Sequence, residues 1–296
     1  MRKEMITTSV RGLNEDSLPF RLYQKAKKFG GWDPREIDFT QDVKDWQFLT
    51  GDQQEEILRL VSQFQAGEEA VTLDLLPLIM VIAKEGRLEE EMYLTTFLYE
   101  EAKHTEFFRF FLNEIGQTGD LSRFHSDTYR TIFYSILPDA MEKLQHDHSP
   151  EALAEASTVY NMFVEGVLAE TGYFSFYESL AKANVMPGLM KGIGLLKRDE
   201  SRHIGYGTFL LQRLIAEHPH LFDLVQNKMN QLAPLAAQLT QEGIGGRTHS
   251  AFGNTLDATM AFSMKQLSVR MDILARAKGK SMNEIYRTTE SDVGVL

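Results

Sequence analysis

Two pairs of residues in this 296-residue chain are spaced to bind a metal ion. Glu101 precedes His104 by three positions, and Glu200 precedes His203 by the same distance. On an α-helix this spacing places both side chains on one face, one turn apart. A single ion could therefore contact both members of a pair.

A Glu and a His at this spacing also occur by chance. With eight histidines and 42 acidic residues in the chain, about one such pair is expected at random. A third pair, Glu217 and His220, has Pro219 between its members, and proline ends a helix. We therefore expect this third pair to bind no metal.

A further glutamate precedes each of the first two pairs at nearly the same distance. Glu68 lies 33 residues before Glu101, and Glu165 lies 35 residues before Glu200. At about 1.5 Å per residue, such a span fits one helix, a turn and a second helix that returns to the same height. The midpoints, residues 84–87 and 184–188, contain the glycine and proline expected of turns. Two hairpins would thus present four Glu and two His at one level of a four-helix bundle, which suits two metal ions. The sequence leaves Glu69 open as an alternative metal ligand to Glu68.

Capping residues and breakers predict the helices that position these ligands. The chain is expected to be all-α, as a single domain of residues 1–296. Its parts are an irregular N-terminal segment at 1–49, the metal-binding bundle at 50–217, accessory helices at 218–277 and a polar tail at 278–296. The bundle helices are predicted at 51–84, 88–115, 150–183 and 193–217, with a crossover helix at 127–145 and accessory helices near 220–243 and 252–277.

The composition of the chain limits which partners, metal ligands and cellular locations we expect. A net charge of −11 disfavours nucleic acid as a partner. The absence of cysteine leaves only oxygen and imidazole as metal ligands. Residues 1–5 contain no apolar signal region, and no apolar run reaches transmembrane length, so a cytoplasmic protein is expected.

Four carboxylates and two imidazoles suit iron or manganese better than structural zinc. Metal-bound histidine normally donates its other N–H to a carboxylate. Glu100 and Asp199, each directly before a motif glutamate, are placed to serve the histidine of the opposite pair. Oxygen activation is the most economical purpose of such a site.

Small residues follow Glu165 at three-residue intervals, at Gly166, Ala169 and Gly172. This stripe allows either close helix packing or a cavity beside the metals for an organic ligand. The sequence leaves both interpretations open.

The chain resembles the ferritin-like di-metal carboxylate superfamily that includes the ribonucleotide reductase small subunit, and more closely its manganese/iron ligand-binding oxidases. The resemblance runs from residues 32–38 through both Glu-x-x-His motifs. It implies a homodimer, O2 as oxidant and a bound long-chain fatty acid in the Gly166, Ala169 and Gly172 stripe. It also implies manganese at Glu68, Glu101 and His104, and iron at Glu165, Glu200 and His203, with di-iron as the alternative.

Val71 and Tyr160 account for the specific part of the resemblance, because the ligand-binding oxidases join a valine and a tyrosine at these placements through an ether bond. Val71 lies three residues after Glu68, and Tyr160 lies five residues before Glu165. Five residues rotate an ideal α-helix by about 140°, so Tyr160 would share the face of Glu165 only if the helix bulges.

Three other functions remain open from the sequence. A ribonucleotide reductase small subunit would store a radical on a tyrosine four residues after the first motif His, where Phe108 stands in this sequence. Some reductases do without that tyrosine, so a small subunit that lacks it stays open. Trp32 and Asp199 nevertheless resemble the electron-relay residues of that protein. A fatty-acid desaturase or hydroxylase shares the paired motifs. A ferritin-like storage protein would need little more than one four-helix bundle.

Overall fold

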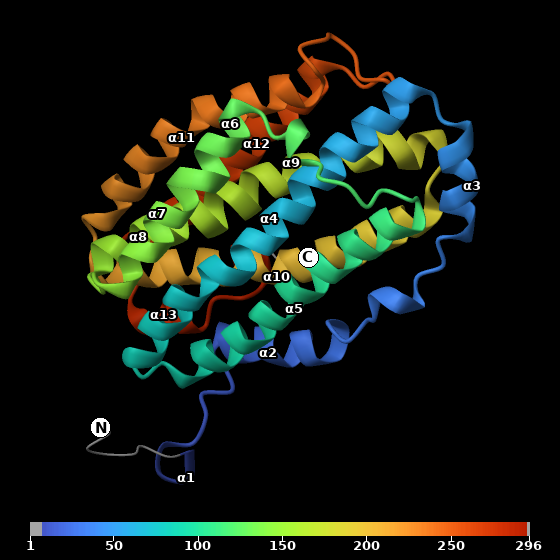
Figure 1. Cartoon of the computed structure of the whole chain (residues 1–296). Helices are drawn as coiled ribbons and strands as arrows, with labels where there is room; N and C mark the ends of the chain where they lie inside the picture. The colour runs from blue at the N-terminus through green and yellow to red at the C-terminus, as the bar shows by residue number, and fades with distance from the viewer. Residues whose placement is uncertain (1–7, 295–296) are drawn as a thin grey trace.

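The computed structural model describes residues 8–294, and within that range the only β pairing is an isolated bridge between His249 and Thr255. The all-α prediction is confirmed. Four long helical segments form the bundle (Figure 1). They are α4 (Gly51–Lys84), α5 (Leu88–Glu114), a third segment made of α8 (Pro150–Ser157), the π-helical η5 (Thr158–Ala169), α9 (Glu170–Phe176) and the π-helical η6 (Tyr177–Ala181), and α10 (Pro187–Glu217).

Capping residues begin two of these segments where the sequence predicts. The Thr50 hydroxyl accepts the backbone N–H of Gln53, whose side chain accepts the N–H of Thr50 in return, so a capping box starts α4. Ser149 caps α8 through the N–H of Ala152. Both caps satisfy backbone donors that a helix start leaves free.

The fourth bundle helix begins earlier than predicted, at Pro187 and not at residue 193. The Asp42 carboxylate, from α3 (Thr40–Phe48), accepts the N–H groups of Gly188 at 2.8 Å and Leu189 at 2.7 Å. These bonds satisfy the free donors of the first turn of α10. A cap supplied by a distant residue has no local sequence signal, which explains the error.

A long crossover joins α5 to α8, as predicted at residues 127–145. Two outer helices then pack against the third bundle segment, along the side of the molecule marked in orange and red in Figure 1. The crossover follows η2 (Ser122–Phe124) and comprises α6 (Asp127–Thr131), η3 (Ile132–Ile136), α7 (Leu137–Glu142) and η4 (Lys143–Gln145); the outer helices are α11 (Leu221–Gly243) and α12 (Leu256–Ala275).

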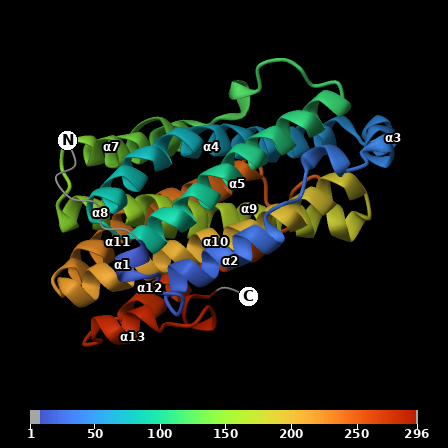
Figure 2. The ribbon, with the colours of Figure 1, turned by 90° about the horizontal axis from the view of Figure 1, so that it is seen from below.

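Short helices form both ends of the described region. The segment before the bundle contains α2, which packs along α5 and α10 (Figure 2). The polar tail buries Ile285 and Val293 completely. Isolated apolar residues produce no periodic pattern, so sequence reasoning missed them. The elements are α1 (Thr8–Arg11), α2 (Leu18–Phe29), η1 (Pro34–Glu36), α13 (Met282–Tyr286) and η7 (Ser291–Val293).

Two buried apolar clusters occupy the bundle, and the predicted ligands that α4, α5 and α10 carry lie between them. On α5, for example, Phe97 belongs to one cluster and Phe107 to the other, with the first Glu-x-x-His motif between them. The polar layer is thus enclosed on both sides by hydrocarbon. None of the described helices combines the length and apolar character needed to cross a membrane. Residues 1–5, on which the expectation about signal regions rests, lie outside the described residues.

Candidate metal centre

The bundle brings the six predicted ligands together in one buried group. Each of these six residues is at most 6% exposed. They form two overlapping sets whose ligand atoms lie within 4.8 Å of one another, and both sets contain Glu101 and Glu200. The first set is Glu68, Glu101, His104 and Glu200, and the second is Glu101, Glu165, Glu200 and His203.

The Nδ1 atom of each histidine faces the carboxylates. Nδ1 of His104 lies 3.3 Å from an oxygen of Glu200 and 3.4 Å from one of Glu68. Nδ1 of His203 lies 3.1 Å from an oxygen of Glu101 and 3.4 Å from the other oxygen of Glu200. Carboxylates shared by two histidines in this way are placed to bridge two ions.

Glu69, the alternative left open by the sequence, faces away from this group. Its side chain is exposed and accepts a hydrogen bond from Gln65 at 3.0 Å. The structure therefore favours Glu68 as the contributor from α4.

The outer nitrogen of each histidine meets the carboxylate expected from the opposite pair. Nε2 of His104 lies 3.3 Å from Asp199, and Nε2 of His203 lies 2.9 Å from Glu100. Trp32 donates its indole N–H to the same Asp199 oxygen at 2.8 Å. These contacts orient both rings so that Nδ1 points into the centre.

Two buried cations, which sequence reasoning missed, neutralise these outer carboxylates. Lys103 donates to Asp199 at 2.8 Å, and Arg202 donates to the other oxygen of Asp199 at 2.6 Å and also to Glu100. Both cations are at most 4% exposed. A signal was available, because a basic residue directly precedes the histidine in both motifs.

The electrostatics of the metal-free site divide the carboxylates into two kinds. Burial, reinforced by the Glu101 charge, raises the pKa of Glu68 well above its usual value. Burial would also raise the pKa of Glu101, but the charge of His203 and the close contacts with both histidines hold it well below the usual range. Burial alone would lower the pKa values of the two histidines, yet the surrounding carboxylates raise both. Without metal, protons therefore occupy the site.

A π-helix supplies the bulge that Tyr160 requires. The segment η5 covers both Tyr160 and Glu165. Its i to i+5 hydrogen bonding brings residues five apart close to the same face. The Tyr160 hydroxyl is fully buried and donates to Glu101 at 3.2 Å, and Asn161 donates to Glu165 at 3.0 Å.

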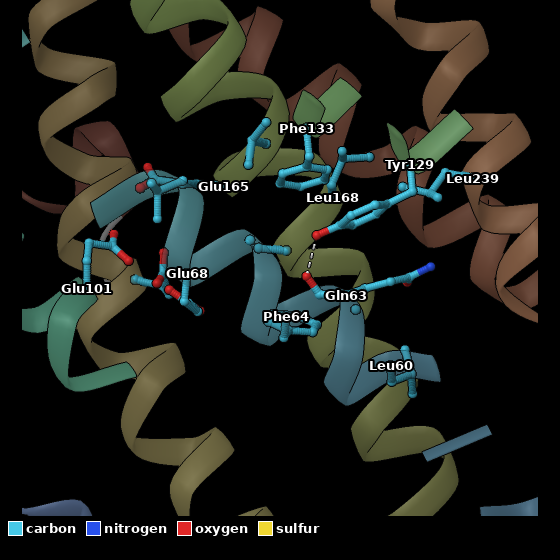
Figure 3. A pocket seen from close by; sticks show the side chains of 16 residues that line it. Leu60, Gln63, Phe64, Glu68, Glu101, Tyr129, Phe133, Glu165, Leu168 and Leu239 are labelled. Atoms are coloured by element: carbon cyan, nitrogen blue, oxygen red, sulfur yellow. Dashed lines mark hydrogen bonds between the residues drawn. The ribbon is translucent and has the colours of Figure 1, made fainter. Parts of the chain in front are cut away.

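A cavity that is open to solvent at its mouth reaches the carboxylates from one side (Figure 3). Ala169 and Gly172 line it, together with Val71 and Phe64. Apart from the glutamates, Gln63 and the Tyr129 hydroxyl, the lining is apolar.

The prediction that Gly166 lines this cavity is wrong. A side chain there would meet the Arg270 Nε atom at 3.1 Å, so Gly166 faces α12 and lets the two helices approach closely. The wider turn of the π-helix rotates Gly166 out of the stripe that α-helical spacing assumes.

The donor set fits a pair of transition-metal ions. Four buried atoms in the site have no hydrogen-bond partner: Glu101 Oε2, His104 Nδ1, Glu165 Oε1 and His203 Nδ1. Buried polar atoms normally have partners, and atoms left without one call for an unrecorded ion or water. Oxygen and imidazole donors are those that iron and manganese accept.

Comparison with known proteins agrees with this geometry. The family model of the ribonucleotide reductase small chain matches residues 20–246. A solved R2-like ligand-binding oxidase with an aerobically reconstituted Mn/Fe cofactor is 40% identical, covers 92% of this chain and 98% of its own, and superposes with a TM-score of 0.84. A point mutant of such an oxidase, also aerobically reconstituted with Mn/Fe, is 40% identical over 91% of this chain and 98% of its own, with a TM-score of 0.87. An anaerobically reconstituted mutant has the same identity and coverages and a TM-score of 0.85.

Proposed function

We propose, from the premise that this chain belongs to the ribonucleotide reductase small-chain family and within it to the R2-like ligand-binding oxidases, that its buried centre holds one manganese and one iron ion and oxidises a C–H bond by two electrons with O2. The observation that carries the proposal is the pair of ligand sets sharing Glu101 and Glu200. Glu68 and His104 complete a manganese position, and Glu165 and His203 complete an iron position, as in the sequence-based assignment.

The protein's own residues exclude water and hold the reacting groups. The metal pair supplies the electrons that begin O2 reduction and the oxidising power for the substrate step. Tyr160 is completely buried, and its hydroxyl is fixed against Glu101. Val71 lines the cavity beside Glu68 and Glu101, in the same apolar cluster as Tyr160.

An ether bond between Val71 and Tyr160 is the expected product of oxidation in this protein. A C–H bond in the side chain of Val71 and the O–H bond of Tyr160 break, a C–O bond forms, and two electrons and two protons pass to the oxidant. Protein reconstituted with both metals in air should lose the mass of two hydrogen atoms and yield one joined peptide. Tyr160→Phe should bind both metals and show no mass loss. Separate, unmodified Val71 and Tyr160 peptides from the wild type would contradict the cross-link.

A long-chain fatty acid is the proposed occupant of the cavity. The space suits an organic ligand because its lining is mostly apolar and it ends at the carboxylates of the metal centre. Its metal end, at Glu68 and Glu165, would receive the carboxylate. We expect solvent extraction of the purified protein to release a fatty acid detectable by mass spectrometry, and Ala169→Phe, which fills the cavity, to lose the lipid while retaining both metals. An empty wild-type cavity would contradict the proposal.

A second copy of the protein is proposed to pack on α4 and α5. Leu73, Leu76 and Met80 expose 66%, 43% and 57% of their surfaces along one side of α4, and Tyr99 exposes 58% on the neighbouring α5. Exposed apolar side chains on two neighbouring helices are what an interface would bury.

The proposed interface predicts that a double substitution on α4 changes the oligomeric state. Replacing Leu73 and Met80 with Glu should convert a dimer to a monomer in light-scattering measurements without changing metal content, because charges would be buried unpaired. Phe48→Glu, at an apolar residue on α3 that is 88% exposed, is the matched control and should stay dimeric. A monomeric wild type would refute the interface.

The reductase alternative lacks its radical residue. Phe108 occupies the place of the radical tyrosine, is fully buried and packs against Phe64 with ring centroids 5.6 Å apart. A residue without a hydroxyl cannot store a tyrosyl radical there. Oxidation of the protein itself and of a bound ligand therefore suits the site better than radical storage at that position.

A further inference from the structure

A row of aromatic rings leads away from the candidate metal centre between α5 and α10. The His203 ring stacks on Phe97 with centroids 3.7 Å apart and an interplanar angle of 10°. Phe97 lies 6.0 Å from Tyr93, and Tyr93 lies 5.2 Å from Tyr206. All four side chains are completely buried. A histidine of the centre is thus connected through ring contacts to two tyrosines that the proposed oxidation does not use.

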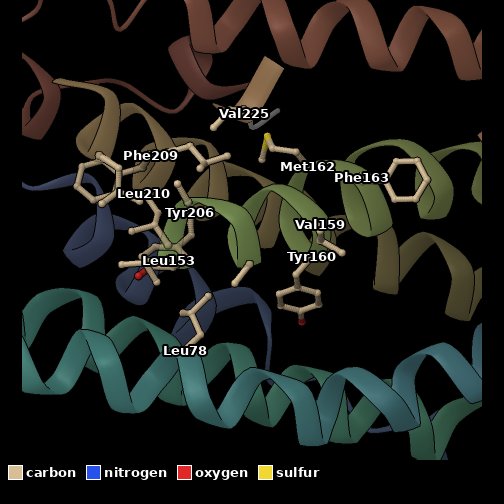
Figure 4. Packing of buried hydrophobic residues seen from close by; sticks show 14 of the residues in the cluster. Leu78, Leu153, Val159, Tyr160, Met162, Phe163, Tyr206, Phe209, Leu210 and Val225 are labelled. Atoms are coloured by element: carbon tan, nitrogen blue, oxygen red, sulfur yellow. The ribbon is translucent and has the colours of Figure 1, made fainter. Parts of the chain in front are cut away.

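The row continues to the surface at α13. Tyr206 lies 6.4 Å from Phe209, and Phe209 lies 6.0 Å from Tyr286. Figure 4 shows Tyr206 and Phe209 side by side in the packed interior. Tyr286 is partly exposed, lines a polar surface cavity and accepts a hydrogen bond from Arg87 at 2.7 Å. Aromatic rings therefore connect the centre to a surface that a soluble molecule can reach.

Tyr206 is the ring in this row with a buried base beside it. Its hydroxyl donates to Glu90 Oε2 at 3.0 Å, whereas the buried Tyr93 hydroxyl has no hydrogen-bond partner among residues 8–294. Glu90 is 2% exposed, and Arg213 lies 3.4 Å from its other oxygen, Oε1. Burial raises the pKa of Glu90, which makes its carboxylate a better proton acceptor. An oxidised phenol is a strong acid, so a buried tyrosine gives up an electron readily only where its proton has an acceptor in reach.

The tryptophan on the other side of the centre is less suited to lose an electron. Trp32 reaches His104 through Asp199, but the Lys103 ammonium lies 4.4 Å from the centroid of the indole ring. A cation over a ring stabilises the neutral ring and opposes the positive charge that oxidation creates. This arrangement favours electron transfer through the tyrosines.

We propose that Tyr206 and Glu90 form a one-electron relay between the dinuclear centre and a reductant at Tyr286, a role that rests on the proposed oxidase function. The oxidant is the O2-oxidised metal centre, which gains one electron from Tyr206. The phenolic proton passes at the same time to Glu90, leaving a neutral tyrosyl radical beside a protonated carboxyl. An external one-electron donor then supplies an electron through Tyr286 and Phe209, and Glu90 returns the proton. The relay would let a donor that stays at the surface re-reduce the buried centre.

Freeze-quench electron paramagnetic resonance tests the relay. Full-length protein loaded with Mn(II) and Fe(II) is mixed with O2 without added reductant. We expect a tyrosyl signal that changes its hyperfine pattern when 3-fluorotyrosine replaces Tyr206, disappears in Tyr206→Phe and is much weaker in Glu90→Gln, which keeps the hydrogen bond and removes the base. Tyr177→Phe, whose ring lies beneath Lys197 and outside the row, is the matched control and should retain the signal.

A second readout on the same samples separates the relay from the proposed function. Intact mass reports whether the Val71 to Tyr160 ether bond has formed. A cross-link in every one of these variants, with the radical signal lost only in the relay variants, supports the relay. A cross-link with an unchanged signal in Tyr206→Phe, or with no tyrosyl signal in the wild type, overturns the relay and leaves the oxidase standing. Loss of both cross-link and radical in the wild type overturns the proposed function as well. Circular dichroism and metal content confirm that each variant is folded and loaded.

Discussion

Loading the protein with manganese and iron should raise its unfolding temperature by about 10 °C, the gain expected when a ligand at about a thousand times its dissociation constant binds only the folded state. The physical reason is the cost of the metal-free centre. Four carboxylates and two imidazoles are held in a buried space, and burial together with the Glu200 charge raises the pKa of Glu165 well above its usual value. Bound metal ions replace these protons, and their positive charge neutralises the buried carboxylates. Differential scanning calorimetry of metal-free and loaded protein measures the gain.

Glu165→Gln is the matched control for this prediction. Glutamine has the shape of a protonated glutamate, so the metal-free variant should unfold within a few degrees of the metal-free wild type. Since an amide is a poor ligand, added metal should stabilise the variant much less. Equal stabilisation of variant and wild type would show that the metals bind elsewhere.

Metal binding should release protons at neutral pH, and its affinity should rise with pH. In the metal-free protein the pKa values of His104 and His203 are raised well above their usual value, chiefly by Glu68 and Glu200 respectively, against the opposing effect of burial. Each proton that must leave adds about a factor of ten in affinity per pH unit, as long as the pH is below the pKa of that group. Titration calorimetry in buffers of different ionisation enthalpy counts the protons, and Glu165→Gln should release fewer. A pH-independent affinity would contradict the protonation assigned to the empty centre.

The same pKa shifts determine whether the folding stability of the metal-free protein rises or falls with pH. Groups with raised pKa values bind more protons in the folded state, so the stability of the metal-free protein falls as pH rises above the ordinary histidine value of about 6.5. Glu101 and Asp199 have lowered pKa values, despite burial, and their contribution is present above the ordinary carboxylate range and lost in acid. Metal-free protein should therefore be most stable at mildly acidic pH, whereas loaded protein keeps its stability at higher pH.

Periodic and repeated features of the sequence predicted most of the architecture. The capping box at Thr50 and the turn at residues 84–87 predicted the bounds of α4 and α5 nearly to the residue, and the repeat of Glu-x-x-His identified the buried group. The structure confirms the all-α class and shows Glu101 and Glu200 common to both ligand sets. These features succeed because a helix start and a helix face depend on residues close in sequence.

Most of the errors depend on contacts between residues far apart in the sequence. The early start of α10 depends on Asp42, and the buried tail depends on the pocket that receives Ile285. Gly166 was misplaced because the π-helix changes the angle per residue, and Arg270 from α12 occupies the space beside it. The buried cation Lys103 went unnoticed because lysine is normally a surface residue.

The most direct test is anomalous X-ray diffraction at the manganese and iron absorption edges, from crystals of protein loaded with both metals. The account predicts two peaks among the six side chains, with Glu101 and Glu200 between them, manganese on the side of Glu68 and His104, and iron on the side of Glu165 and His203. A single ion, or no ion among these residues, would contradict it.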